Sequence, residues 1–190
     1  MWLTLILLSL AESQAQTLPV VISKHYTTHE GLPSNNVMCA LKDRDGFLWF
    51  GTWYGLCRFD GDRFMTYNKS IRWGSDTPPR KIEGMAEDKR GVLWLKTVDW
   101  KLYTFNRQTE CFHAVYDELK HYTKNLQIIK IQRTDEGRIL LLTKDKTLLM
   151  ADTDDHGSVH ISKLTDAQGK IDPQTLHAVF LFRCHSNLQN

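Results

Sequence analysis

The segment from Gly31 to Tyr67, GLPSNNVMCALKDRDGFLWFGTWYGLCRFDGDRFMTY, decides the fold of this chain, because its pattern returns twice and then begins a fourth time. Asp-Gly pairs at 45–46 and 60–61 separate short runs of apolar and aromatic residues, which is typical of hairpins joined by tight turns. The runs predict four strands, at Val37–Lys42, Phe47–Thr52, Leu56–Asp60 and Phe64–Asn68. A short antiparallel meander of this kind is one blade of a β-propeller.

The later repeats follow the first at intervals of 45 to 49 residues. The second repeat matches the first at four positions, in the pairs Asp43 and Asp88, Gly46 and Gly91, Trp49 and Trp94, and Thr52 and Thr97. The third repeat keeps Gly137 and Thr143 and carries Leu140 at the tryptophan position. A fourth begins after Pro173 and stops within its second strand. The predicted fold class is all-β, a partial β-propeller of four-stranded antiparallel blades, with three blades and the start of a fourth.

The repeats divide the chain into consecutive segments. We expect a leader at 1–16, an N-terminal strand at 17–30 that closes the last blade, blades at 31–79, 80–126 and 127–172, and a truncated blade at 173–190. In the N-terminal strand, Tyr26 is predicted to be the equivalent of Tyr67. A propeller must close on itself, because part of one leaves strand edges unpaired. We therefore expect an N-terminal fragment of a larger protein, or else an intact three-bladed domain that pairs its edges with another copy.

The first residues, MWLTLILLSLAESQAQ, indicate a secretory leader. An apolar run from Trp2 to Leu10 precedes Ser13 and Ala15, which are placed like the small residues before a cleavage site. The alternative is a short buried strand or helix, since no basic residue precedes the apolar run. The run is too short to span a bilayer, and no other segment is a candidate span.

Charge and cysteine content exclude some classes of function. The 24 basic and 22 acidic side chains leave a net charge of +2, which is too even to indicate nucleic acid or an anionic membrane as a partner. Four cysteines occur, at Cys39, Cys57, Cys111 and Cys184. Export would permit disulfides, but the first two fall on strands of one blade that are not neighbours, which favours buried free thiols. No cysteine or histidine spacing suggests zinc.

Several motif-like stretches are better explained by structure than by chemistry. Trp49 and Trp94 occupy one repeat position, which predicts core aromatics between blades. The acidic stretches 43–46 and 152–155 lack the further carboxylates of a calcium loop and suit tight turns. His29-Glu30 begins like HExxH, but Pro33 stands at the second histidine position. We therefore predict no metal site, no cofactor and no catalytic residue.

The ends of the strands carry the candidate binding residues. In a four-stranded meander, the one-two and three-four loops lie at one end, and the two-three loops and blade connections lie at the other. The second end receives eight candidate ligand-binding residues, Trp53, Tyr54, Arg72, Trp73, Asp99, Trp100, Asn35 and Asn36. Rings stack on sugar C–H faces while amides and carboxylates bind hydroxyls, so this face predicts an oligosaccharide site. Each residue alone also suits an ordinary loop residue that covers strand ends.

The first repeat resembles the two-component regulator propeller repeat. That repeat reads Gly-Leu-Pro, Ser-Asn-Asn, Asp-x-x-Gly-x-Leu-Trp-x-Gly-Thr, Gly-Leu and a closing aromatic pair, and the match here is nearly complete. The second repeat departs from it at Lys96, which replaces the glycine before threonine, and the third and fourth repeats match weakly. The stretch HYTTHEGLPSNN also resembles the start of the hybrid two-component sensors of gut Bacteroidetes.

The resemblance implies a periplasmic sensor with two seven-bladed propellers, an immunoglobulin-like domain, a membrane helix, a histidine kinase core, a receiver and a DNA-binding domain. It also implies an oligosaccharide signal and a transcriptional output. The present chain would cover the leader and about three blades, so no enzymatic activity is expected of it. The expected partners are an oligosaccharide, the rest of the propeller and a second copy in a homodimer, without direct contact with nucleic acid or membrane.

Two alternatives to a sensory module stay open. A propeller lyase or hydrolase would need acid and base groups facing each other across the central channel, and Asp99 and Glu30 are isolated candidates. A structural scaffold would pair its blades with a partner and would have a flat loop face without pockets.

Overall fold

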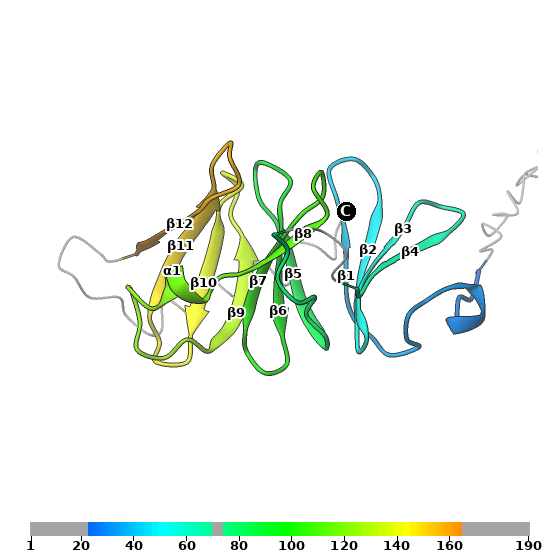
Figure 1. Cartoon of the computed structure of the whole chain (residues 1–190), viewed down its shortest axis with the longest axis horizontal. Coiled ribbons are helices and arrows are strands. Elements are labelled where there is room, and N and C mark those ends of the chain that lie inside the picture. The colour runs from blue at the N-terminus through cyan, green and yellow to red at the C-terminus, as the bar shows by residue number, and fades with distance from the viewer. Residues whose placement is uncertain (1–22, 70–73, 165–190) are drawn as a thin grey trace, which may run out of the picture.

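Three four-stranded antiparallel sheets follow one another along the chain (Figure 1). The computed structural model describes residues 23–69 and 74–164. Blade 1 contains β1 (Val37–Lys42), β2 (Leu48–Thr52), β3 (Gly55–Phe59) and β4 (Phe64–Tyr67). Blade 2 contains β5 (Ile82–Glu87), β6 (Leu93–Thr97), β7 (Leu102–Asn106) and β8 (Cys111–Ala114). Blade 3 contains β9 (Ile128–Arg133), β10 (Ile139–Thr143), β11 (Leu148–Thr153) and β12 (Val159–Lys163).

Each sheet is a simple meander in which every strand pairs with its neighbours in sequence. A short 3-10 helix, η1 (Thr28–Glu30), precedes blade 1, and a one-turn helix, α1 (Tyr116–Leu119), joins blades 2 and 3. The all-β propeller prediction is confirmed, and the four strands predicted for the first repeat differ from the observed ones by at most one residue at each end. Within the described ranges, no helix is long and apolar enough to cross a membrane.

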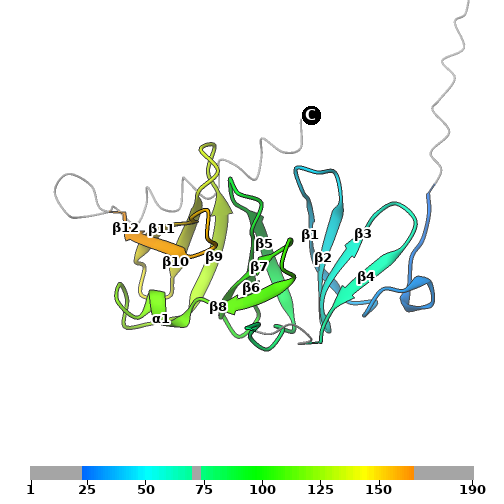
Figure 2. The same ribbon diagram turned by 45° about the horizontal axis from the view of Figure 1, so that its top comes forward.

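The blades stand side by side, with blade 2 between the other two in both views (Figures 1 and 2). Their first strands adjoin, since β1 packs against β5 and β5 against β9. We call the end with the one-two and three-four loops the turn end, and the end with the two-three loops and blade connections the rim. The turn end is uppermost in Figure 1 and the rim is at the bottom.

Aspartates at the turn end bind the backbone of their own turns. Asp43 Oδ1 accepts hydrogen bonds from the backbone N–H groups of Asp45 and Phe47, at 3.0 and 2.9 Å. Asp154 Oδ1 does the same for His156 and Ser158, at 2.9 Å each. The turn interpretation of both acidic stretches is therefore confirmed. Within the described ranges, no group of three or more His, Cys, Asp or Glu side chains could hold a metal ion.

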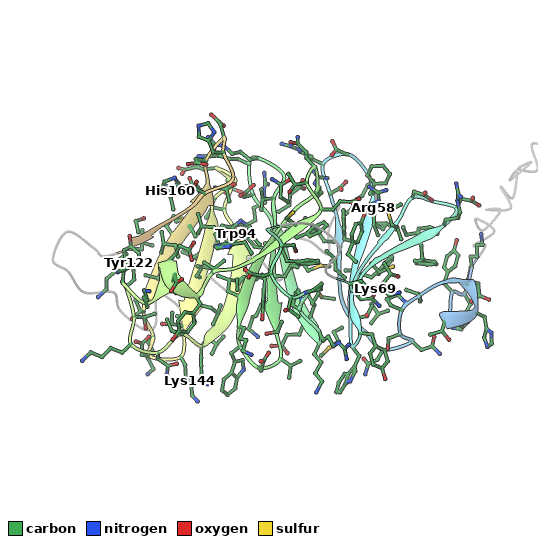
Figure 3. The ribbon with its side chains drawn as sticks, viewed as in Figure 1. Arg58, Lys69, Trp94, Tyr122, Lys144 and His160 are labelled. Atoms are coloured by element: carbon green, nitrogen blue, oxygen red, sulfur yellow. The ribbon has the colours of Figure 1, made fainter. Side chains whose placement is uncertain are left out.

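The repeated tryptophans lie in the core between blades, as predicted. Trp49 is 1% exposed and its indole N–H donates to Asp43 Oδ2 at 2.7 Å, while Trp94 is fully buried and donates to Asp88 Oδ2 at 3.1 Å. The indole thereby satisfies its one polar group inside an apolar cluster. Figure 3 shows Trp94 between the sheets.

The same aspartates also bind the next blade. Asp43 Oδ2 accepts from the Arg107 guanidinium of blade 2, and Asp88 Oδ2 accepts from Thr153 Oγ1 of blade 3 at 2.7 Å. Arg107 and Thr153 stand 46 residues apart, at one position of the repeat. The aspartate thus fixes its own turn, its own tryptophan and the neighbouring blade at once.

Blade 3 replaces the aspartate and the tryptophan together. Thr134 takes the aspartate position, 46 residues after Asp88, and its hydroxyl accepts from the Arg138 backbone N–H at 3.1 Å. Leu140 takes the place of the indole and is buried. Because a leucine has no N–H to satisfy, the buried carboxylate is no longer needed, which explains why the third repeat is weak in sequence and regular in structure.

A second replacement explains Lys96. Gly51 pairs across the strands with Cys39, and a Cβ on Gly51 would lie 2.5 Å from the Cys39 sulfur. In blade 2 the same two positions hold Lys96 and Gly84, so the small residue has changed strand. Blades 1 and 2 thus each keep one small residue in this cross-strand pair. Blade 3 has none there, since it pairs Leu142 with Lys130.

Tyr26 contacts the outer face of blade 1. Its ring lies 5.0 Å from Phe59 and 5.3 Å from Phe64, which resembles the 4.9 Å contact of Tyr67 with Phe105. Phe59 and Phe105 share one repeat position, so Tyr26 is placed as the equivalent of Tyr67. Residues 23–27 form no strand among the described residues, and the last blade, with which the N-terminal strand is expected to pair, is not among them, so the strand at 17–30 stays a prediction.

Three cysteines are free thiols, namely Cys39, Cys57 and Cys111. Burial raises the pKa of the Cys39 and Cys57 thiols to about 11, which keeps both protonated and unreactive. The leader at 1–16, the strand residues 20–22, Cys184 and the fourth blade at 173–190 lie outside the described residues.

Candidate functional site

The rim brings together the loops that carry six of the eight predicted binding residues. Trp53 and Tyr54 form the β2–β3 turn and are 38% and 53% exposed. Asp99 and Trp100 belong to the β6–β7 loop, and Asn35 and Asn36 immediately precede β1. The other two, Arg72 and Trp73, lie outside the described residues.

Backbone hydrogen bonds connect these loops from blade to blade. The Trp53 N–H donates to the Asn36 carbonyl at 3.1 Å, and the Trp53 carbonyl accepts from Lys81 N–H at 3.2 Å. The Lys81 carbonyl in turn accepts from the Val98 N–H at 2.9 Å. The carbonyl of Trp100 accepts from Ile128 N–H at 2.8 Å. The rim loops therefore form one bonded series across the three blades, and their exposed side chains have a fixed order along it.

Not every predicted residue presents its polar group to a ligand. The Asn35 side-chain oxygen accepts the Thr28 N–H at 2.8 Å and so holds η1 in place. Asp99 accepts from Thr97 Oγ1 at 2.6 Å and pairs with Lys101 at 2.9 Å. The Thr97 hydrogen bond, followed by Lys101, lowers the pKa of Asp99, which keeps this carboxylate ionised at neutral pH.

A lysine from the following blade lies over the exposed Trp53 and another over the half-buried Trp100. Lys81 Nζ lies 4.7 Å from the centre of the Trp53 ring, and Lys144 Nζ lies 4.5 Å from the Trp100 ring. Both distances suit a cation–π interaction. Figure 3 shows Lys144 at the rim and Arg58 at the opposite, turn end.

Two hollows open on the rim side of blade 2 and share a wall formed by Asp99, Lys101 and Tyr103. One measures about 280 Å³ and is further lined by Trp100, Tyr116 and Leu126 among others. The other measures about 410 Å³ and includes Pro78, Pro79 and Arg80. An aromatic, mostly apolar hollow with a few polar groups at its edge suits a ring-shaped ligand with hydroxyl substituents.

A larger hollow of about 590 Å³ lies at the turn end, but its charges belong to the scaffold. Arg107 pairs there with Asp43, with Asp45 at 2.9 Å and with Glu87 at 3.0 Å. Burial raises the pKa of Glu87 in spite of these cations. The arginine therefore serves to join blades 1 and 2.

Several rim residues were missed from the sequence. Lys81, Lys101, Tyr103, Tyr116 and Lys144 all lie beside the predicted candidates. A signal for Lys144 existed, because it stands at the repeat position of Trp53 and Val98 in the two-three loop of its blade. Tyr103 lies on β7 at the repeat position of Cys57, and Lys101 lies in the β6–β7 loop, whereas Lys81 and Tyr116 belong to connections between blades, where repeat alignment gives no register.

Comparison with known proteins relates this chain to a repeat family and to solved structures of similar fold. Residues 31–54 match the family model for the two component regulator propeller. No curated protein matches the chain significantly. The fold resembles an extracellular domain assigned to the hybrid two component system BT3049 from B. thetaiotaomicron, with 20% identity and a TM-score of 0.53 over 75% of this chain and 25% of that one.

A second similar structure is an extracellular domain assigned to the one component system BT4673 from B. thetaiotaomicron, with 19% identity, a TM-score of 0.50 and coverage of 77% of this chain and 18% of that one. The chain thus spans a quarter or less of the length of these structures. At such identities the likeness shows a shared fold, and the sequence match adds the repeat family. The chain therefore contains a two component regulator propeller repeat within a β-propeller fold.

Proposed function

We propose that this chain is part of the extracytoplasmic, ligand-sensing propeller of a hybrid two-component sensor histidine kinase, and that it binds an oligosaccharide at the rim. In this proposal the propeller lies in the periplasm and ligand binding is passed on to transcription by the rest of the sensor. The repeat family and the shared fold support the class of protein. The rim supports the kind of ligand.

One observation carries the proposal: two rim tryptophans, Trp53 and Trp100, lie at successive contacts between neighbouring blades. Trp53 and Trp100 lie in two-three loops whose backbones are bonded to the next blade, through Lys81 and Ile128 respectively. A fixed ring loses little conformational entropy when a sugar binds to it, which favours affinity. The hollow beside Trp100 supplies an apolar wall, and Lys101 and Asp99 supply polar atoms at its edge.

Sensing further requires that ligand binding favours one of two conformations. The blade connections suit this role, because the rim ligand would contact residues of more than one blade. A ligand that bridges the β6–β7 loop and the connection at 77–81 would favour one relative position of blades 1 and 2. Binding energy could then change the position of the blades and be read at a distance.

We propose that the two acidic residues considered as catalytic candidates have structural roles and do not take part in catalysis. Asp99 is occupied by Thr97 and Lys101, and Glu30 accepts from the Thr27 hydroxyl and N–H in the capping box of η1. Each carboxylate has a local structural partner that accounts for its position.

Isothermal titration calorimetry with a panel of oligosaccharides tests the proposal on the full chain within its native ectodomain. We expect at least one glycan to bind with a defined stoichiometry, and the binding to be lost in a double Trp53→Ala, Trp100→Ala variant that unfolds at the same temperature as the wild type. Absence of binding by every glycan, while the native signalling output still responds to a glycan, would contradict the direct sensing of sugar.

A further inference from the structure

Two exposed lysines on the rim have no carboxylate partner among the residues that the structure describes. Lys81 and Lys144 each place the ammonium group over a tryptophan ring, at 4.7 and 4.5 Å from its centre. Over the ranges 23–69 and 74–164, neither lysine lies within ion-pair distance of an Asp or Glu side chain. Their charges are therefore held in position by aromatic rings and are not neutralised by any described carboxylate.

The acidic side chains of the neighbouring rim loops are already engaged. Asp99 binds Thr97 and Lys101, and Asp145 accepts hydrogen bonds from the hydroxyls of Thr143 and Thr123. Neither carboxylate is free to rotate towards Lys81 or Lys144 without breaking these contacts. The positive charge at the two seams is consequently available to a ligand.

The two lysine–tryptophan pairs come from different positions of the repeat. Lys81 precedes β5, whereas Lys144 follows β10. In both cases a lysine of the following blade lies over a tryptophan of the preceding one. Simple copying of the repeat therefore does not account for the two pairs.

A lysine over the ring changes the ligand that the ring can accept. A neutral sugar would have to displace the ammonium group from the ring face before stacking on it, and would offer the displaced ammonium group no counter-ion. A sugar with an anionic substituent provides a counter-ion and a charge-assisted hydrogen bond in the same step. The pair therefore discriminates by charge, and not only by shape.

We propose that the rim binds an acidic oligosaccharide, one that carries carboxylate or sulfate groups. Lys81 and Lys144 each pair with one anionic group, and Trp53 and Trp100 contact the sugar rings beside them. This inference rests on the proposed function, because it assigns the class of oligosaccharide to the same rim. Uronate and sulfate groups share the chemistry that the lysines recognise, and the experiment separates them.

Calorimetric titration of the full chain compares three matched probes of equal length: a neutral galactose tetrasaccharide, a galacturonic acid tetrasaccharide and a sulfated galactose tetrasaccharide. We expect one of the two acidic probes to bind about tenfold more tightly than the neutral one at low salt, which is the combined effect of two exposed ion pairs. The preference should shrink as salt rises from 20 to about 150 mM, since screening weakens exposed charges.

A double variant, Lys81→Gln with Lys144→Gln, should make the affinities for the acidic and the neutral probe equal, because the acidic probe loses its counter-charges and the neutral probe no longer has to displace an ammonium group from a ring. The matched control is Lys42→Gln with Lys163→Gln, which removes the same charge from exposed positions on β1 and β12 and should leave the preference intact. Thermal unfolding of both double variants verifies that each is folded.

Equal affinity for neutral and acidic probes, with binding still lost in the tryptophan variant, would overturn the acidic assignment and leave the proposed function standing. Loss of the preference in the control variant would overturn the assignment to Lys81 and Lys144, because overall charge would then explain it. Failure of all three probes and of a wider glycan panel would overturn the proposed function as well.

Discussion

The turn end and the rim of this protein are built on the same twelve strands but are held together differently. At the turn end, Asp43 binds its own turn, the Trp49 indole and Arg107 of the next blade. At the rim, blades are joined by backbone hydrogen bonds, as from Lys81 N–H to the Trp53 carbonyl, which leaves the side chains exposed. At the turn end side chains hold the blades together, whereas at the rim the backbone does so and side chains such as Trp53 and Tyr54 are exposed.

The residues that define the repeat motif differ from those of the proposed binding site. The aspartate, glycine and tryptophan that define the repeat lie at the turn end or in the seams, and each has a structural partner. Trp53, Trp100 and the lysines over them lie in loops that the repeat does not specify. Substitutions at the two ends should therefore have opposite consequences for stability and for binding.

The largest loss of stability should follow Asp43→Ala. The change leaves the Arg107 guanidinium, which is 14% exposed, without its buried partner and removes the acceptor of the Trp49 indole. We expect the free energy of unfolding to fall by about 3 kcal/mol in urea denaturation. The control Asp60→Ala removes an aspartate that caps only its own exposed turn and should cost clearly less. Equal losses in the two variants would contradict the role of Asp43 between blades.

A smaller loss should follow Gly51→Ala. The added methyl group would lie 2.5 Å from Cys39 Sγ and 2.7 Å from the Ile82 carbonyl oxygen, so the seam between blades 1 and 2 must open. We expect a cost of about 2 kcal/mol, typical of an overpacked core. Adding Cys39→Gly, which copies the small residue of blade 2, should restore part of the loss. Thermal unfolding of the single and double variants measures this coupling, and strict additivity would argue against it.

Acid should remove the contribution of Asp43 to the free energy of unfolding over a defined pH range. Burial alone would raise the pKa of Asp43, but hydrogen bonds from Trp49 and Phe47 and the charge of Arg107 lower it below the ordinary value of 3.8. A carboxyl with a lowered pKa in the folded state stabilises the fold above its ordinary pKa, and this contribution is lost as the pH falls through the lowered value. The difference in unfolding free energy between wild type and Asp43→Asn should therefore narrow below about pH 4. A constant difference from pH 7 to pH 2 would show that the charge of Asp43 is not involved.

The smallest change in stability should follow Trp53→Ala at the rim. The ring is 38% exposed and its backbone contacts do not depend on the side chain. We expect a loss of less than about 1 kcal/mol in unfolding free energy, as for surface positions, but at least about a tenfold loss of glycan affinity. A large loss of stability with unchanged affinity would place this tryptophan in the scaffold.

The fold was predictable from sequence because turn residues and apolar runs recur at fixed positions of the repeat. Asp-Gly turns and the short apolar and aromatic runs between them located every strand of blade 1 to within one residue, and the shared repeat position of Trp49 and Trp94 predicted their place between blades. The side-chain contacts that join neighbouring blades were not predictable in the same way. Arg107 and Thr153 occupy the same repeat position but have different side chains, a guanidinium and a hydroxyl. Each binds an aspartate that is distant in sequence.

The candidate site was predictable only in part. The meander rule located Trp53, Tyr54, Asp99 and Trp100 at the rim, because strand order fixes the end at which each loop lies. It could not show that Asn35 is occupied by Thr28, since that contact depends on the local turn of η1. Nor could it place Lys144 over Trp100, because contacts across a seam depend on how adjacent blades pack.

The most direct test of this account measures folding and glycan binding in parallel for two variants, Asp43→Ala at the turn end and the Trp53→Ala, Trp100→Ala double variant at the rim. Urea unfolding and calorimetric titration are carried out on the same samples, at a temperature where both variants are folded. The account predicts that the turn-end variant loses stability and keeps its glycan affinity, whereas the rim variant keeps its stability and loses its affinity. Glycan binding that survives in the rim variant and disappears in the folded turn-end variant would contradict it.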